Sequence, residues 1–232
     1  MPTPKPVVSI VIPVFNEEHT LGKVIQGVKE TMKCMGLSFE VLVVDDCSTD
    51  NSLGISLRSN VRVLQIMEHR GKGYALRAGF RKVRGEIIVT IDSDGSHSPE
   101  ELPKLVEPIL SGEADFVIGS RFLDKNNIFQ NKFNKAGVQL LNILVKALTG
   151  KGVSDSQSGY RAFKSVMLKF VNLKSNGYEI ESEMLVKAFR IGVRTKEVPI
   201  KFIQRTHGKS KLDPLKDGVK IFTATLLSCI GV

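Results

Sequence analysis

The sequence predicts an α/β domain in which helices cover both faces of one doubly wound, largely parallel sheet. Short runs of apolar and β-branched residues alternate with segments of helical periodicity, and this alternation is typical of such sheets. The chain has 232 residues, of which 42% are hydrophobic, so it can bury one core of substantial size. Because no stretch rich in Pro, Gly or Ser interrupts the pattern, we expect a single domain over residues 1–215, followed by an apolar helix over residues 216–232.

In the first half of the chain, short apolar runs predict five strands. They cover residues 7–14, 39–46, 61–67, 86–91 and 115–119. The first intervening helix begins near Leu21 and stops at Gly36, and residues 48–50 offer caps for a short second helix. A basic helix is predicted over residues 72–84. The next helix starts with a capping box and an early proline, formed by Ser98, Glu101 and Pro99.

The second half of the chain is less regular. Residues 134–150 predict a helix that is apolar over most of its surface, residues 180–190 another helix, and residues 193–205 a strand. The apolar end, residues 219–232, is about a dozen residues long, whereas a helix that spans a bilayer needs about 20. We expect this end to be a surface anchor or the first turns of a spanning helix.

Net charge and cysteine content indicate the class of partner and the redox compartment of the protein. A formal net charge of +9 favours an anionic partner, such as a phosphorylated substrate, an anionic lipid or a nucleic acid. The three cysteines have no CxxC spacing, so neither a disulfide framework nor a zinc site is indicated, and a reducing, cytoplasmic setting fits. The first residues lack a basic region before a long apolar core, so we expect no signal peptide.

Two of the predicted strands end in acidic residues, one at Asp45 and Asp46 and the other at Asp92 and Asp94. In open α/β sheets, ligands bind beyond the carboxyl ends of the strands. Like charges held close together are costly unless a cation or a hydrogen-bond donor compensates them. Divalent cations such as Mg²⁺ prefer oxygen ligands and share them with substrate phosphates. The pattern therefore predicts a metal–phosphate site at Asp92 and Asp94, whereas Asp50 is expected to cap a loop or a helix start.

Six motifs occur in a characteristic order: "IVIPVFNEE", "VLVVDDCSTD", "TIDSDGSHSPEEL", "VIGSRF", "SDSQSGYRAF" and "RTHGKSKL". Together they resemble family-2 glycosyltransferases over nearly all of residues 7–215, and most closely the polyprenyl-phosphate sugar synthases. The resemblance implies the GT-A fold, a Rossmann-like mixed sheet that is mostly parallel. It also implies that Pro13, Phe15 and Glu17 line a nucleoside pocket, with Val44 and Asp46 at the base or the ribose.

The resemblance implies further roles around the donor diphosphate. Asp92 and Ser93 would lie near the sugar or the ribose, and Asp94 would bind Mg²⁺ or Mn²⁺ together with the diphosphate. Mannose synthases usually carry a metal-binding glutamine where this chain has Ser96, so the metal ligands expected here are Asp94 and Ser96. His97 is expected to face solvent at the start of a helix, with metal binding as the alternative.

Basic residues complete the expected site. The resemblance implies that Arg121 faces the donor sugar or the acceptor phosphate, and that Arg205 and Lys211 clamp phosphates. Lys72 lies between two glycines and is a candidate to approach the donor phosphates. Residues 194–220 hold eight Lys or Arg against three Asp or Glu, so cations are plentiful there.

The expected reaction passes a hexosyl or N-acetylhexosaminyl unit from a UDP- or GDP-sugar to a polyprenyl (dolichyl) phosphate, with inversion. A phosphate monoester has a second pKa of about 6 and is already a nucleophile at neutral pH, whereas a sugar hydroxyl needs a general base. Residues 134–150 and the apolar end are expected at the cytoplasmic face of a membrane, although residues 134–150 equally fit a buried core helix. Glu181 is either an acid near the acceptor or a charge at a helix N-terminus.

Other functions stay open. One is a family-2 transferase that acts on a sugar hydroxyl in polysaccharide or glycolipid synthesis, although the QxxRW motif of processive members needs a tryptophan and the chain has none. A nucleotidyltransferase would commonly have a glycine-rich basic loop after the first strand, which is absent here. A nucleic-acid-binding module fits the net charge, but acidic strand ends repel phosphate, so we expect no nucleic-acid partner. The nucleotide, the sugar, the polyprenol length and the oligomeric state are left open.

Overall fold

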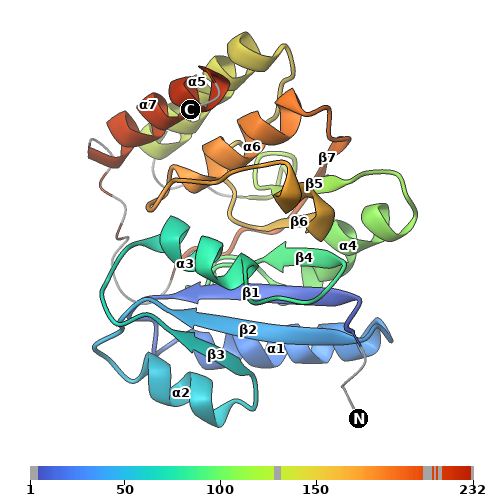
Figure 1. Ribbon diagram of the computed structural model, residues 1–232, viewed down its shortest axis with the longest axis vertical. Helices are drawn as coiled ribbons and strands as arrows, with labels where there is room; N and C mark the ends of the chain where they lie inside the picture. The colour runs from blue at the N-terminus through green and yellow to red at the C-terminus, as the bar shows by residue number, and fades with distance from the viewer. Residues whose placement is uncertain (1–4, 128–131, 206–210, 212, 214–215, 231–232) are drawn as a thin grey trace.

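Seven strands form one mixed sheet in the computed structural model, which describes residues 5–127, 132–205, 211, 213 and 216–230. The strands are β1 (Val8–Val14), β2 (Phe39–Asp45), β3 (Arg62–Gln65), β4 (Ile87–Thr90), β5 (Phe116–Ser120), β6 (Arg161–Lys164) and β7 (Thr195–Pro199). Their order is β3-β2-β1-β4-β6-β5-β7, and β6 runs antiparallel to both of its neighbours while the other pairs are parallel (Figure 1). The predicted mixed, mostly parallel sheet is confirmed.

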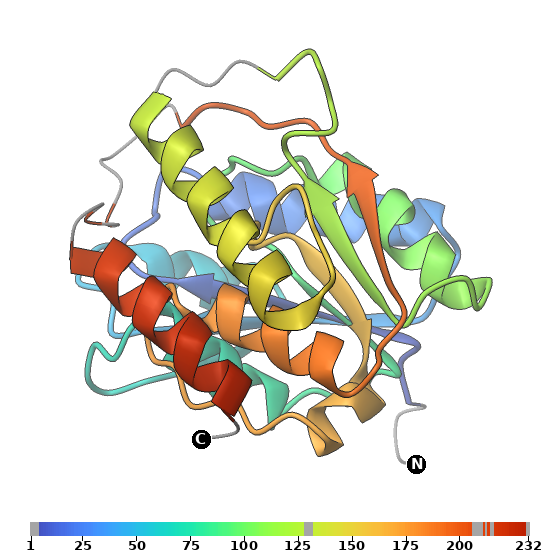
Figure 2. The same ribbon diagram turned by 90° about the horizontal axis from the view of Figure 1, so that it is seen from above.

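Helices cover both faces of the sheet, and two more helices lie outside them. The helices are α1 (Leu21–Cys34), α2 (Ser52–Arg58), α3 (Lys72–Phe80), α4 (Leu102–Leu110), α5 (Lys132–Thr149), α6 (Ile180–Arg190) and α7 (Lys216–Ile230). Helices α1 and α4 pack on one face of the sheet, and α3 and α6 pack on the other. Helices α5 and α7 lie side by side against α6, at the end of the molecule opposite α2 and β3 (Figures 1 and 2).

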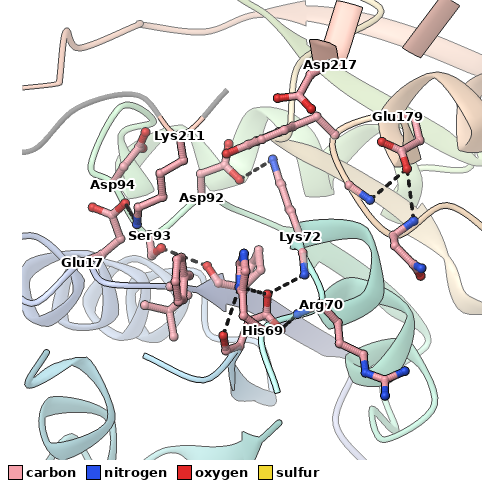
Figure 3. Close-up of a pocket in the computed structure, with 18 of the residues that line it drawn as sticks. Glu17, His69, Arg70, Lys72, Asp92, Ser93, Asp94, Glu179, Lys211 and Asp217 are labelled. Atoms are coloured by element: carbon pink, nitrogen blue, oxygen red, sulfur yellow. Dashed lines mark hydrogen bonds and ion pairs between the residues drawn. The ribbon is translucent and has the colours of Figure 1, made fainter. Parts of the chain in front are cut away.

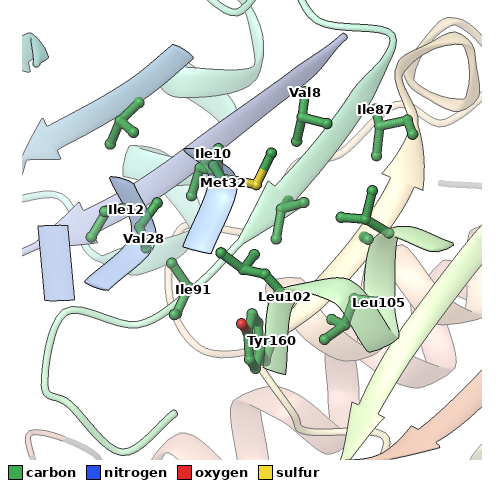
Figure 4. Packing of buried hydrophobic residues seen from close by; sticks show 14 of the residues in the cluster. Val8, Ile10, Ile12, Val28, Met32, Ile87, Ile91, Leu102, Leu105 and Tyr160 are labelled. Atoms are coloured by element: carbon green, nitrogen blue, oxygen red, sulfur yellow. The ribbon is translucent and has the colours of Figure 1, made fainter. Parts of the chain in front are cut away.

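Strand β1 is buried along its whole length because helices cover both faces of the sheet. Successive side chains of a strand point to opposite faces. Ile10 and Ile12 share a cluster with Met32 of α1 and Leu105 of α4 (Figure 4). Val11 packs on the face covered by α3. Burying such a side chain contributes about 1.5–3 kcal/mol. This packing fixes the carboxyl end of β1, from which the first loop of the site projects.

Some local predictions need correction. The strand expected over residues 193–205 is limited to β7, which ends at Pro199 because its partner β5 ends at Ser120, the residue paired with Pro199. The expected capping box is absent: the Ser98 side chain makes no cap hydrogen bond, because the first turn is a 3-10 turn and Glu101 pairs with Lys104 at 2.5 Å instead. Within the described part of the chain, no helix combines the length and the apolar character needed to cross a membrane.

Candidate active site

A cavity of about 510 Å³ opens beyond the carboxyl ends of β1, β2 and β4. Its walls also include the first turns of α3 and α7 and residues 176–179 (Figure 3). Open α/β sheets bind ligands at this position. The predicted site residues that line the cavity are Pro13, Phe15, Glu17, Asp46, Lys72, Asp92, Ser93, Asp94, Arg205 and Lys211. Val44, Ser96 and Arg121 lie outside its lining.

Lys72 joins two carboxylates at the floor of the cavity. Its Nζ lies 2.6 Å from Oδ1 of Asp92 and 2.8 Å from Oε1 of Glu181. Burial alone would lower the pKa of Lys72, but the two negative charges raise that pKa above its usual value. Burial alone would raise the pKa of Asp92, and Lys72 nevertheless holds it below its usual value. Gly159 leaves room for this pair, since a Cβ there would lie 2.7 Å from both Asp92 Oδ2 and Lys72 Nζ.

Asp94 turns its carboxylate in a different direction from Asp92. Its Oδ1 accepts the backbone N–H of Ser96 at 3.0 Å, which is a local turn, and its Oδ2 faces Arg205 Nη1 at 3.7 Å. The Ser96 side chain is buried and does not reach the cavity. Among the described residues, no group of three or more His, Cys, Asp or Glu could hold a metal ion. Asp94 is an oxygen donor in the cavity lining, and carboxylate oxygens are ligands that hard cations prefer.

Two cations stand beside Asp94, and both are paired with Glu17. The Glu17 carboxylate receives Arg205 Nη2 and, at 3.0 Å, Lys211 Nζ. Lys211 Nζ also donates to the carbonyl of Asn16 at 3.1 Å and lies 5.0 Å from the centre of the Phe15 ring. The middle of the "RTHGKSKL" motif, residues 206–210, lies outside the described residues.

The part of the cavity near Phe15, where the sequence predicts a nucleoside pocket, has an aromatic wall. Phe15 and His69 stack with ring centres 3.9 Å apart, and His69 Nδ1 lies 2.8 Å from Asp46 Oδ2. Asp46 also accepts the backbone N–H groups of Arg70 at 2.9 Å and Gly71 at 2.7 Å, so its carboxylate orders the loop before α3. Sequence reasoning missed His69, because a single histidine after a strand has no distinctive signal.

Arg121 stands behind the cavity wall and is held by Asp155. Its Nε and Nη2 donate to the two Asp155 oxygens at 2.7 and 2.8 Å, and Asp155 is fully buried. Burial alone would lower the pKa of Arg121, but Asp155 raises it, with smaller contributions from Asp92 and Glu181. The guanidinium therefore lies close enough to the Lys72 pair to share its electrostatic field.

His97 corrects one prediction, because it does not face solvent. The side chain is 2% exposed and packs against Tyr160 and Phe202, with ring centres 5.2 and 6.5 Å away. Its Nδ1 is 3.8 Å from Asp92 Oδ2, and burial lowers the pKa of His97. A β-bridge between His97 and Phe202 attaches the segment that carries Arg205 to the loop that carries Asp94. The position before a helix suggested exposure, but this long-range bridge buries the ring.

Comparisons with known sequences agree with this geometry. Residues 9–170 match the family described as glycosyl transferase family 2. An uncharacterised protein of Methanocaldococcus jannaschii is 35% identical over 227 residues, which cover 95% of this chain and 91% of that protein. The undecaprenyl-phosphate mannosyltransferase of Micrococcus luteus is 34% identical over 218 residues, which cover 87% of this chain and 86% of that enzyme.

Comparison with solved structures gives the same fold. Glucosyl-3-phosphoglycerate synthase from Mycobacterium tuberculosis, solved with Mn²⁺, UDP and phosphoglyceric acid, matches with a TM-score of 0.79 at 26% identity. The match covers 97% of this chain and 78% of that one. The expected GT-A fold is confirmed.

Proposed function

Because the chain belongs to glycosyl transferase family 2, we propose that it transfers a hexosyl or N-acetylhexosaminyl unit from a nucleotide-diphosphate sugar to a polyprenyl phosphate. We further propose that transfer inverts the sugar and needs Mg²⁺ or Mn²⁺. The solved synthase with Mn²⁺ and UDP supports the donor, and the undecaprenyl-phosphate enzyme of Micrococcus luteus supports the acceptor.

The donor side of the cavity is defined here as Phe15, Glu17, Asp94, Arg205 and Lys211. Phe15 offers a ring for the nucleoside, while Asp94 is the carboxylate to hold a divalent ion. When bound, such an ion neutralises charge on the departing diphosphate. Arg205 and Lys211 add fixed positive charge beside Asp94, so they stabilise the same leaving group electrostatically.

We assign Lys72, Asp92, Arg121, Asp155 and Glu181 to the acceptor side, although the sequence favoured Lys72 and Asp92 for the donor. The observation that carries this proposal is the bridge that Lys72 makes between Asp92 and Glu181. Glycosylation of a hydroxyl normally requires a carboxylate that is free to take its proton. Asp92 and Glu181 instead share the single positive charge of Lys72, and Asp155 is paired with Arg121, so each of these carboxylates already has a cationic partner. An acceptor phosphate is already ionised near neutral pH, with a second pKa of about 6, so it needs cations to bind it rather than a base.

In the proposed reaction, an oxygen of the acceptor phosphate attacks the anomeric carbon of the donor sugar. The bond from that carbon to the donor diphosphate breaks, and the nucleoside diphosphate leaves with the electron pair. Attack from the face opposite the leaving group inverts the anomeric centre. The product is a sugar joined to the lipid through a phosphodiester, and no proton has to be removed from the acceptor.

The outer surface of α5 and α7 supports a lipid acceptor. Leu140 and Ile143 of α5 are 60% and 66% exposed, and Val219 and Ile230 of α7 are 69% and 73% exposed. Lys220 of α7 lies at the rim of the cavity. Exposed apolar side chains beside lysines favour binding at the surface of an anionic membrane, on its cytoplasmic face. A polyprenyl chain resting on these helices would bring its phosphate to the cavity.

The test has two steps. Calorimetry with UDP- and GDP-sugars, each with and without Mn²⁺ or Mg²⁺, identifies the donor, and incubation with a short polyprenyl phosphate then measures transfer. We expect metal-dependent binding of one nucleotide sugar, followed by transfer to the lipid phosphate. Donor binding with transfer only to a sugar hydroxyl would replace the proposed acceptor, and absence of nucleotide binding would overturn the proposal as a whole.

A further inference from the structure

Asn142 of α5 links this outer helix to the loop that holds Arg121. Its Nδ2 donates to the carbonyl of Ser154 at 2.7 Å, and its Oδ1 accepts the backbone N–H of Ser156 at 3.0 Å. The side-chain amide therefore bridges the two residues that flank Asp155. Neither the motifs nor the periodicity of the sequence single out this residue.

The loop that Asn142 bridges is fixed from other directions as well. Glu197 of β7 accepts the backbone N–H groups of Ser154 at 2.7 Å and Asp155 at 3.0 Å. The buried Arg161 of β6 donates to the carbonyl of Ser156 at 2.7 Å. These contacts hold the backbone against the sheet, so Asn142 is the described side chain that connects the loop to α5.

Asp155 belongs to this loop and holds the Arg121 guanidinium, so the position of the loop backbone determines the position of this cation. Besides the two side-chain contacts, Asp155 Oδ2 accepts the backbone N–H of Arg121 at 3.1 Å. A carboxylate with three donors from one residue leaves that residue little freedom. A displacement of residues 154–156 would therefore move the Arg121 guanidinium relative to Lys72 and the acceptor.

Helix α5 has one face in the core and one face exposed. Leu141 and Val145 are 9% and 0% exposed, whereas Leu140 and Ile143 make up the exposed apolar surface described above. In the sequence, Asn142 stands between the buried Leu141 and the exposed Ile143. The same short segment therefore contacts the core, the loop around Asp155 and the surface proposed to meet lipid.

We propose that Asn142 is a positioning residue, which holds Arg121 in place for the acceptor phosphate through residues 154–156 and Asp155. This inference rests on the proposed function. Asn142 is expected to affect binding of the acceptor and not of the donor, because its hydrogen bonds go to the two residues that flank Asp155 on the acceptor side of the cavity. Binding of the nucleotide sugar should not depend on this residue.

The test compares Asn142→Leu with the control Gln139→Ala in the full chain. Asn142→Leu removes both hydrogen bonds at similar side-chain size, whereas Gln139 is exposed on the same helix. We expect Asn142→Leu to raise the KM for a short polyprenyl phosphate about tenfold, equivalent to about 1.4 kcal/mol, because two hydrogen bonds are lost. Donor affinity, measured by calorimetry, should stay within about twofold of wild type, and Gln139→Ala should match wild type in both measurements.

A second variant covers the case in which Asn142→Leu fails to fold. Asn142→Ala removes both hydrogen bonds without adding a charge or a larger apolar side chain, so a similar rise in acceptor KM is expected, again without a change in donor affinity. Equal acceptor KM in wild type and variants, or an equal loss of donor and acceptor binding, would overturn the role of Asn142 alone. Absence of transfer to polyprenyl phosphate by the wild type would overturn the proposed function, and this inference with it.

Discussion

The donor side and the acceptor side of the cavity hold their charges in different ways. On the donor side, Glu17 is shared between two cations, and Arg205 approaches Asp94 only to 3.7 Å. The long contact between Arg205 and Asp94 can be exchanged for contacts with the proposed diphosphate and metal ion at low cost. On the donor side, contacts between protein side chains can therefore be replaced by contacts with the substrate.

The acceptor side is built from short ion pairs in which Glu181 and Asp155 are buried, while Lys72, Asp92 and Arg121 are partly exposed. Lys72 has carboxylate oxygens at 2.6 and 2.8 Å, and Arg121 binds Asp155 through two nitrogens. Removing one partner of a buried pair leaves an uncompensated charge, which is costly. This side is thus preorganised, and the comparison predicts that donor-side changes will mainly affect turnover while acceptor-side changes will also affect folding.

Asp94→Ala should have the largest effect on turnover, because it removes the carboxylate expected to bind the metal ion. We expect transfer to fall by roughly 1,000-fold or more and metal-dependent donor binding to be lost. Transfer assays and calorimetry with Mn²⁺ measure these effects. The exposed Glu100, six residues along the chain, provides the control Glu100→Ala. Metal-dependent binding that persists in Asp94→Ala would remove Asp94 from the donor side.

Lys72→Met should show the folding cost of the acceptor side. Asp92 and Glu181 would lose their shared cation, so we expect the free energy of unfolding to drop by about 3 kcal/mol near neutral pH. Urea unfolding measures this change. The surface pair of Lys196 and Glu113 supplies a control, because Lys196→Met should cost less than about 1 kcal/mol.

The pH dependence of the same variant sharpens this prediction. The pKa of Asp92 is lowered in the folded protein. The ion pair with Lys72 therefore stabilises the fold at pH values above the ordinary pKa of a carboxyl group, and this stabilisation is lost as pH falls through the lowered pKa of Asp92. The stability deficit of Lys72→Met should therefore shrink as pH falls below about 4. A deficit that stays constant down to acid unfolding would mean that charge pairing with Asp92 is not its cause.

Lys211→Ala should have the smallest effect, confined to turnover. Arg205 would still stabilise the leaving diphosphate, so we expect the rate of transfer to fall only about tenfold. Lys211 is 32% exposed and its pair with Glu17 contributes less than about 1 kcal/mol, so thermal unfolding should hardly change. The exposed Lys23 of α1 serves as a control through Lys23→Ala. Wild-type turnover in Lys211→Ala would exclude the cation from the donor side.

The two sides also differ in how far the sequence predicts them. The apolar runs of β1 and β4 place Phe15, Glu17 and Asp94 just beyond strand ends, because strand periodicity and burial are local properties. The motifs around them carry the family resemblance. The donor side is therefore largely predictable from local sequence, as far as the position of its residues is concerned.

The acceptor side depends on contacts between distant segments, which local patterns do not encode. Strand β6 begins with a buried arginine, Arg161, and has no apolar run, so its antiparallel place between β4 and β5 was not predicted. The pairing of Lys72 with Glu181 joins residues more than 100 positions apart, as their numbers show. The burial of His97 likewise depends on a bridge to Phe202.

The central claim, that the acceptor is a phosphate and needs no base from the protein, is tested most directly by the pH profile of transfer. With saturating donor and metal, the rate should follow only the second ionisation of the polyprenyl phosphate, near pH 6. An acceptor analogue whose phosphate group titrates at a different pH should move the profile by the same amount, and the matching polyprenol should receive no sugar. A profile that stays fixed when the acceptor changes, or transfer to the polyprenol, would contradict the account.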